Sequence, residues 1–459
     1  MKKLIGNKQF YRMALIIAVP IMIQNGITNF VGMLDNIMIG QVGQEEMSGV
    51  SIVNELMFVF NLAIFGAISG PGIFSAQFFG NGDHEGVRFT FRFKLIIGAI
   101  IGAVGTLLFL LYGEQLISLF LHESSNGGDI KVTLAYAKEY LFIMIFGLIP
   151  FIISQCYSST LRETGETKIP MVAGIAAVVV NFILNSFLIF GLCGVPKLGV
   201  VGAAIATVIS RFVETFIIVY WTHTHKERNH FIEKAYQSLY IPKYLVKQIL
   251  VKGCPLLINE VMWAAGMAAM TQSYSQRGLE VVAGLNISNT ITNVFNIVFI
   301  ALGSSVAIIV GQLLGANKMK EAKDTAGKLI AFSCLCCVGL GAILALTSPL
   351  FPQIYNTDDL VKNYAREFIL VMSLVMPFHA ITNASYFTLR SGGKTLVTFL
   401  FDSVFVWSCC VPIAYGLVNF TSLTIVPIYL ISKMTEVIKS VIGLVLVKKG
   451  VWLNNMVKG

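Results

Sequence analysis

Charged residues are scarce in this sequence. Asp, Glu, Lys and Arg together make up 12% of its 459 residues, whereas hydrophobic residues make up 56%. Soluble chains carry about 25% charged residues. The apolar runs here repeatedly exceed the ~20 residues that an α-helix needs to cross a bilayer. This composition excludes an ordinary soluble domain and predicts an all-α, polytopic protein whose main partner is the lipid bilayer.

Two sequence signals of other membrane proteins are also missing. The segment SGGKT at 391–395 ends like a P-loop, but the glycine that must begin the motif would be residue 388, which is Thr388. The connection GNGDHEGVR at 80–88 lacks the G-x-x-x-D-R-x-G-R-R pattern of the major facilitator class. The first absence excludes an ATP-binding module, and we expect no enzymatic activity.

Reactive cysteines and basic clusters are not found either. The eight cysteines lie almost entirely inside apolar runs without acidic or histidine neighbours, so we interpret them as packing residues, including CLCC at 334–337. The net charge of +9 comes from basic residues scattered through short loops rather than gathered in one stripe. The pattern therefore argues against a nucleic-acid partner.

The apolar segments predict twelve transmembrane helices in two sets of six. These segments are 13–39, 49–79, 89–112, 130–160, 169–192, 199–222, 246–276, 282–313, 326–348, 361–389, 396–416 and 422–447. The longest polar connection divides the two sets. We therefore predict an N-terminal lobe at 1–222, an inter-lobe linker at 223–245 and a C-terminal lobe at 246–459.

The distribution of basic residues predicts the orientation. Assigning the loops to alternate sides of the membrane gives 24 Lys and Arg residues on one side and six on the other. Positively charged loops stay in the cytoplasm. Both termini and the linker are therefore expected to be cytoplasmic, which agrees with an even number of helices.

The two halves are related in sequence. An offset of 235 aligns, without a gap, Pro20 with Pro255, Glu45 with Glu280, Gly49 with Gly284, Asn54 with Asn289, Gln77 with Gln312 and Gly80 with Gly315. Such a register is the signature of an internal repeat. Because six helices return the chain to the same side, the two lobes must be parallel repeats about an axis along the membrane normal.

Asp35 is the first candidate functional residue, because a carboxylate inside a membrane-length segment is unfavourable by roughly 2.5–3.5 kcal/mol and needs partners. One face of its helix carries Gln24 or Asn25, Thr28, Gly32 and Asp35 or Asn36. The polar stripe predicts that Asp35 faces protein or water. The alternative is that Asp35 lies near the interface and caps the helix.

Neutral oxygens for Asp35 are predicted on two other helices. Asn181 and Asn185 lie one turn apart, and Thr207 follows in the next apolar segment. Neutral oxygens with one carboxylate suit a monovalent cation. We therefore predict a coupling-ion site, with sodium or a proton at Asp35 and no other cofactor.

The second half carries a column of amides. Asn286, Asn289, Asn293 and Asn296 recur at spacings of three, four and three in an otherwise apolar helix. We expect this face to line a wet, substrate-binding surface. The alternative is hydrogen bonding between helices, worth only about 0.6 kcal/mol per contact.

Three further residues are candidates for binding a cation. Asn259 and Glu260 follow Pro255 by about one turn. In the repeat alignment Glu260 corresponds to Asn25, so we expect the two residues at the same depth in the membrane. Asp402 is either a site residue or an interfacial one. Glu260 could alternatively make only a structural hydrogen bond. We interpret His379, Lys433, Glu436 and Lys439 as mostly interfacial or paired.

Several motifs taken together resemble the multidrug and toxic compound extrusion (MATE) transporters. They are DNIMIGQVG at 35–43, LRETGETKIPM at 161–171, NFILN at 181–185 and PKLGVVGAAIATVIS at 196–210. The resemblance covers essentially the whole chain. It implies two six-helix lobes forming a V in a bacterial cytoplasmic membrane, and alternating access.

The resemblance also implies an activity and site residues. It implies export of organic cations or other amphiphiles in exchange for sodium or protons, by a chain that we expect to be a monomer. In that family an aspartate in the position of Asp35 and an N-x-x-x-D pair form an ion site, but here the second member is Asn185. The sodium-coupled bacterial branch carries a glutamate that Glu260 matches.

Two other functions stay open from the sequence. A flippase of lipid-linked precursors, from the same wider superfamily, would be expected to have a strongly cationic cavity, yet Lys and Arg are scarce in the apolar segments. A non-transporting sensor or scaffold would need a partner-binding domain, and neither the termini nor the linker is long enough to form one.

Overall fold

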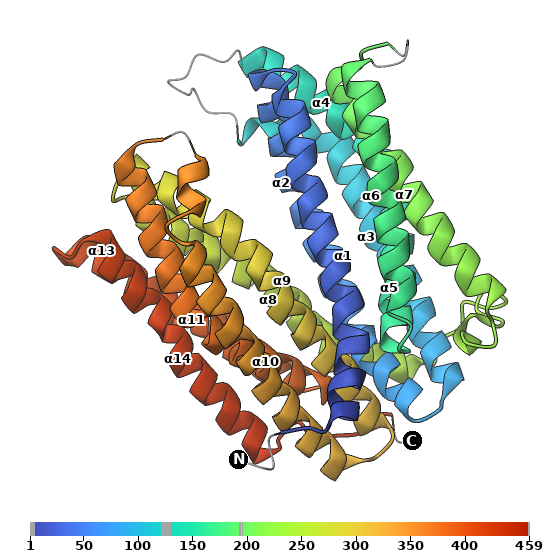
Figure 1. The fold of residues 1–459 in the computed structure, drawn as a ribbon. Helices are drawn as coiled ribbons and strands as arrows, with labels where there is room; N and C mark the ends of the chain where they lie inside the picture. The colour runs from blue at the N-terminus through green and yellow to red at the C-terminus, as the bar shows by residue number, and fades with distance from the viewer. Residues whose placement is uncertain (1–4, 121–129, 192–193, 195, 356, 458–459) are drawn as a thin grey trace. The chain divides into compact units, whose positions relative to one another are not determined.

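The computed structural model describes residues 5–120, 130–191, 194, 196–355 and 357–457, without the side chains at 28, 30–34, 36, 37 and 44. This part of the chain is helical with short turns, and no strand occurs in it (Figure 1). The predicted all-helical class is confirmed.

The described residues form twelve successive helical segments. In this count α4 and α5 form one segment, and α12 and α13 form another. The helices are α1 (Lys8–Gly40), α2 (Gln44–Gly80), α3 (His84–Ser118), α4 (Ile130–Phe146), α5 (Leu148–Glu163), α6 (Lys168–Phe190), α7 (Gly199–Thr224), α8 (Lys243–Ser275), α9 (Leu279–Gly315), α10 (Met319–Thr347), α11 (Asp359–Ser391), α12 (Thr395–Phe399), α13 (Val411–Phe420) and α14 (Ile425–Lys449). Short 3₁₀ turns are η3 (His230–Ile232) and η4 (Phe351–Ile354).

Most of these helices could cross a membrane. Ten of the described helices are long and apolar enough, or eleven when the bent pair α4 and α5 counts as one span. α14 is not among them, and its middle carries Lys433, Glu436 and Lys439. The twelve-segment architecture predicted from the sequence is consistent with this count.

Two predicted helices are irregular for identifiable reasons. The segment predicted at 130–160 bends by 47° between α4 and α5, where Gly147 is followed by Pro150. Proline removes a backbone donor and glycine weakens the helix, so kinks form at such positions. The segment predicted at 396–416 contains two π-helical turns, η5 (Leu400–Val404) and η6 (Val406–Cys410).

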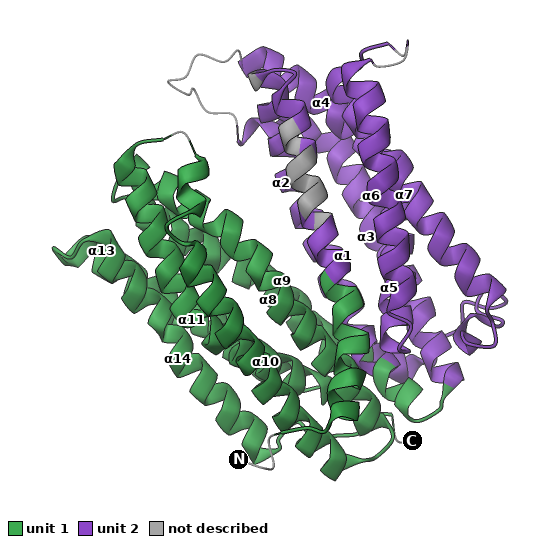
Figure 2. Cartoon of the chain, in the orientation of Figure 1, with its two compact units in different colours: residues 1–22, 76–83, 248–459 green, residues 23–75, 84–247 purple. Residues whose placement is uncertain are grey.

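Packing divides the chain into two compact units (Figure 2). Unit 1 contains residues 1–22, 76–83 and 248–459, and unit 2 contains 23–75 and 84–247. The chain passes from one unit to the other inside α1, inside α2, at the start of α3 and inside α8. α1 and the end of α2 therefore contribute to the packing of the later half of the chain.

An apolar core of unit 2 is built on α2, α4 and α5, which supply Val53, Ile64, Tyr140 and Ile152 among others. Its linker is fixed to α3. The Arg92 guanidinium donates hydrogen bonds to the carbonyl oxygens of Lys234, Ala235 and Tyr240 at 2.7, 2.8 and 3.0 Å. The predicted linker is thus an ordered part of this unit.

Unit 1 contains a reciprocal contact between α2 and α9. A Cβ added to Gly80 would lie 1.9 Å from the Gln312 carbonyl oxygen, and one added to Gly315 would lie 1.8 Å from that of Gln77. Only glycine permits backbones to approach so closely. The four residues are the repeat-related pairs of the sequence alignment, which gives a physical reason for their recurrence.

Candidate functional site

Asp35 lies in unit 2 beside two asparagines of α6. Asn185 Nδ2 donates a hydrogen bond to Asp35 Oδ1 at 2.5 Å and another to Asn181 Oδ1 at 3.2 Å. Asn181 Nδ2 donates to Thr207 Oγ1 of α7 at 3.3 Å. The structure therefore brings together the four residues predicted as a coupling-ion site. The side chains of Thr28 and Asn36 lie outside the described part.

The asparagines are held by the geometry of two packed helices. Asn181 and Asn185 are one turn apart on α6, which packs along α7, so both amides face Thr207. They are buried, whereas Asp35 is half-buried. Half-burial and the hydrogen bond from Asn185 argue against the alternative that Asp35 only caps the end of α1.

One oxygen of this cluster has no donor. Asn185 Oδ1 is buried and accepts no hydrogen bond from the part of the chain that the structure describes. A buried polar atom without a partner is unfavourable by about 1–3 kcal/mol, and a cation coordinated by this oxygen would remove that penalty. The Asp35 cluster, defined as Asp35, Asn181, Asn185 and Thr207, thus offers one carboxylate and neutral oxygens.

Two residues that the sequence analysis did not assign to this site lie next to it. The buried side chain of Tyr140, on α4, places its hydroxyl near Thr207. Arg211, one turn after Thr207 on α7, is close enough to interact electrostatically with Asp35 and lies 3.8 Å from Glu214. No spacing along the sequence connects Tyr140 to α7, so only the fold could identify it.

Across the described residues, no three His, Cys, Asp or Glu side chains converge in a way that could hold a metal ion. The oxygen set at Asp35 differs from such groups because it has a single carboxylate. Its chemistry suits sodium or a proton rather than zinc or iron.

A second cluster forms in unit 1 around Asp402, in the π-helical turn η5. Asn259 Nδ2, on α8, donates to Asp402 Oδ2 at 3.0 Å. Asn259 Oδ1 accepts hydrogen bonds from Ser403 Oγ at 2.7 Å and Ser403 N at 3.3 Å. π-helical turns are frequent at functional sites. Here the wider turn places both Asp402 and Ser403 against Asn259.

Lys439 completes this second cluster. Its Nζ lies 2.6 Å from Asp402 Oδ1, and the two side chains are 4% and 17% exposed. Asp402 is therefore enclosed by protein and paired, which is compatible with the site interpretation. Lys439 lies in the middle of α14, and the sequence interpretation of it as a paired residue agrees with this contact.

Glu260 is not drawn into the same hydrogen-bond network. Consecutive helical residues point about 100° apart, so Asn259 faces Asp402 while Glu260 does not. Glu260 is half-buried and forms no hydrogen bond or ion pair within the described part of the chain. Arg390 and Asp402 are near enough to interact with it electrostatically. The alternative of a structural hydrogen bond thus finds no partner there.

The asparagine column of α9 is separate from both clusters. Asn286, Asn289 and Asn293 are exposed and Asn296 is half-buried. Within the described residues, none of the four side chains hydrogen-bonds to another helix. Among the described helices of unit 1 the column thus makes no hydrogen bond between helices, and its wet lining stays a prediction.

His379 and Glu436 form another, half-buried pair in unit 1. His379 Nδ1 lies 3.6 Å from Glu436 Oε2, and its ring stacks on Phe299 with centroids 6.0 Å apart. Lys433 lies over the ring of Tyr429, 5.3 Å from its centre. α14 thus carries three charged side chains on its inner and partly buried faces, which is unusual for a membrane segment.

Comparison with known families decides the classification. The family model MatE matches residues 20–187 and 255–416, which is most of the chain and one match in each half. The chain belongs to the MatE family. This confirms the resemblance predicted from the sequence motifs.

Bacterial relatives of this MatE chain carry related names. A "Probable multidrug resistance protein NorM" of Thermotoga maritima is 27% identical over 440 residues, covering 95% of this chain and 92% of the relative. A "Probable multidrug resistance protein YoeA" of Bacillus subtilis is 26% identical over 427 residues, covering 90% and 88%.

Solved structures of MATE transporters share the fold. An outward-facing multidrug resistance MATE family transporter matches with a TM-score of 0.85 at 18% identity, covering 98% of both chains. A transporter from Pyrococcus furiosus matches with a TM-score of 0.86 at 18% identity, covering 98% of this chain and 97% of its own. It is described as having a binding pocket of reverse polarity that suggests a different function. One fold thus holds pockets of different polarity, so function must be argued from the residues.

Proposed function

We propose that this MatE chain is a secondary active antiporter that exports organic cations across the bacterial cytoplasmic membrane in exchange for sodium ions or protons. The names of the NorM and YoeA relatives support multidrug export as the class of activity. They favour it over the flippase of lipid-linked precursors, because no such substrate occurs in those names.

The Asp35 cluster is the observation that carries this proposal. It joins one half-buried carboxylate to Asn185, whose buried Oδ1 finds no donor among the side chains that the structure describes. A negative charge in an apolar protein interior is stable only with a positive partner. A sodium ion or proton, and later the cationic substrate, would meet that requirement in turn, which couples the two movements.

The chemistry sets a limit on what one site can do. Exchange of one monovalent cation for another is electroneutral, so the membrane potential contributes nothing. A tenfold ion gradient, about 1.4 kcal/mol, then sustains at most about a tenfold gradient of substrate. Export against a steeper gradient needs a second ion, and the half-buried carboxylate of Glu260 is the residue that we propose for it.

Ethidium efflux from membrane vesicles of a strain without its own pumps tests the proposal. Sodium and pH gradients are imposed separately, and Asp35→Asn is compared with the control Asp324→Asn, whose carboxylate pairs with Lys328 at 2.5 Å on an exposed surface. We expect Asp35→Asn to abolish gradient-driven efflux and the control to keep it.

Binding of ethidium to the purified variants separates coupling from substrate recognition. Asp35→Asn should retain detectable binding, because Glu260 and the asparagines of α9 remain. Efflux by Asp35→Asn at the wild-type rate would refute the proposal. Loss of all binding would instead make Asp35 part of the substrate site.

A further inference from the structure

The ammonium group of Lys439 is held inside unit 1 like a bound ligand. Lys439 is 3% exposed. Its Nζ lies 2.6 Å from Asp402 Oδ1 and 5.7 Å from the centre of the Phe401 ring. A carboxylate and an aromatic face together are the groups with which proteins recognise alkylammonium ions.

The carboxylate of Asp402 is oriented by residues other than Lys439. Asn259 holds its second oxygen at 3.0 Å, and the Asn259 amide is itself fixed by Ser403 and lies 3.4 Å from the Tyr386 hydroxyl. These contacts do not involve Lys439. The site would therefore keep its shape if another cation replaced the lysine ammonium.

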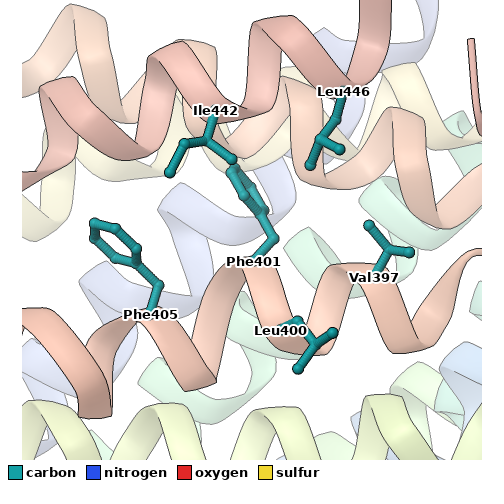
Figure 3. A pocket seen from close by; sticks show the side chains of 6 residues that line it. All are labelled: Val397, Leu400, Phe401, Phe405, Ile442 and Leu446. Atoms are coloured by element: carbon teal, nitrogen blue, oxygen red, sulfur yellow. The ribbon is translucent and has the colours of Figure 1, made fainter. Parts of the chain in front are cut away.

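An apolar cavity adjoins this ion pair. It has a volume of about 210 Å³ and is lined by Val397, Leu400, Phe401, Phe405, Ile442 and Leu446 (Figure 3). Phe401 precedes Asp402 in the chain, and Ile442 lies one turn after Lys439. The Phe401 ring therefore belongs both to the cavity wall and to the surroundings of the ammonium, which places apolar space beside a cation-binding carboxylate.

We propose that Asp402, Asn259 and Phe401 form a site for an amphiphilic alkylammonium ion, and that Lys439 occupies this site as a tethered competitor. The ammonium of the ligand would replace Lys439 Nζ at Asp402 Oδ1, and its alkyl chain would enter the cavity. The inference rests on the proposed function, because an alkylammonium ion belongs to the organic cations named there.

Tethering has two consequences. A short tether gives the lysine ammonium an effective concentration in the millimolar range or above, so only a ligand that gains further affinity from the cavity displaces it. When no ligand is present, Lys439 neutralises Asp402 and no coupling ion is needed there. The coupling ion is then left to the Asp35 cluster, and a second ion to Glu260.

Chemical rescue of Lys439→Ala tests the inference. The substitution removes three carbons and the ammonium, which n-propylammonium replaces atom for atom. Thermal unfolding is measured for four purified proteins: the wild type, Lys439→Ala, the control Lys433→Ala and the double variant Lys439→Ala/Asp402→Asn. Each is measured in propylammonium, hexylammonium, tetramethylammonium and sodium chloride at equal ionic strength.

We expect propylammonium to raise the Tm of Lys439→Ala with saturation, because a ligand that binds only the folded state stabilises it. Hexylammonium should act at a concentration at least tenfold lower, since its longer chain fills the cavity. Wild-type protein and Lys433→Ala should need at least tenfold more hexylammonium. The double variant, in which both charges are gone, should fold but not respond.

Three results would overturn the inference: equal responses of wild-type protein and Lys439→Ala, rescue that persists in the double variant, or rescue by sodium or tetramethylammonium as effective as by the alkylammonium ions. Lys439→Ser opens a gap of similar length and provides a second variant should the alanine protein fold poorly. The measurement uses no ion gradient, so its failure is distinguishable from failure of the antiport proposal.

Discussion

Replacing Gly315 by alanine tests the reciprocal contact between α2 and α9. The added Cβ would lie 1.8 Å from the Gln77 carbonyl oxygen, whereas real Cβ contacts essentially never fall under 3.0 Å. The two backbones must therefore separate by about 1.2 Å, and overpacking of this kind destabilises proteins by about 1–3 kcal/mol. Alanine regains at most about 1 kcal/mol of helix propensity. We expect a net loss of about 2 kcal/mol.

Gly339→Ala in α10 is the matched control, because nothing lies within 4 Å of a Cβ at that position. It should leave stability unchanged or raise it by up to about 1 kcal/mol. Thermal unfolding of both purified variants in one detergent gives the comparison. The repeat-related Gly80→Ala should behave like Gly315→Ala. Equal Tm values for Gly315→Ala and Gly339→Ala would refute the argument that this contact requires glycine.

Three further predictions concern the sites and the orientation. Glu260→Gln keeps shape but removes the charge, so efflux should fall severely at normal protein levels; unchanged efflux would assign Glu260 to structure. Tyr140→Phe removes one hydroxyl next to Thr207, worth about 1 kcal/mol, and should raise the ion concentration for half-maximal efflux about fivefold; an unchanged value would exclude Tyr140 from the site. In a background without native cysteines, Ser422→Cys should react with an impermeant thiol reagent added outside intact cells, and Ser238→Cys should not. The reverse labelling pattern would invert the predicted topology.

Much of the fold could be predicted because membrane helices are long and apolar. Helix boundaries and internal irregularities could not. The bend after Gly147 depends on how α4 and α5 pack, since glycine and proline are also tolerated in straight membrane helices. The π-helical turns around Asp402 likewise have no sequence period of their own. Both irregularities are local departures from a regular helix that the hydropathy pattern alone does not indicate.

The candidate sites could likewise be predicted only in part from the sequence. Asn181 and Asn185 could be placed with Asp35 because a spacing of four residues puts both amides on one helical face. Lys439 could not be placed on Asp402, because a pairing across 37 residues depends on how α14 docks. The sequence also could not tell which of Asn259 and Glu260 contacts Asp402: neighbours in sequence point in different directions on a helix, and only Asn259 hydrogen-bonds to Asp402.

The core of unit 1 has a consequence for how the protein is made. Ala14, Ile17 and Ile21 of α1 pack in one cluster with Val447 and the fully buried Trp452. These apolar side chains leave the ribosome more than 400 residues before Trp452 does. Unit 2 contains no residue beyond 247, so it can assemble during synthesis, whereas the core of unit 1 must wait until Trp452 has been made. α1 is therefore synthesised long before the cluster into which it packs.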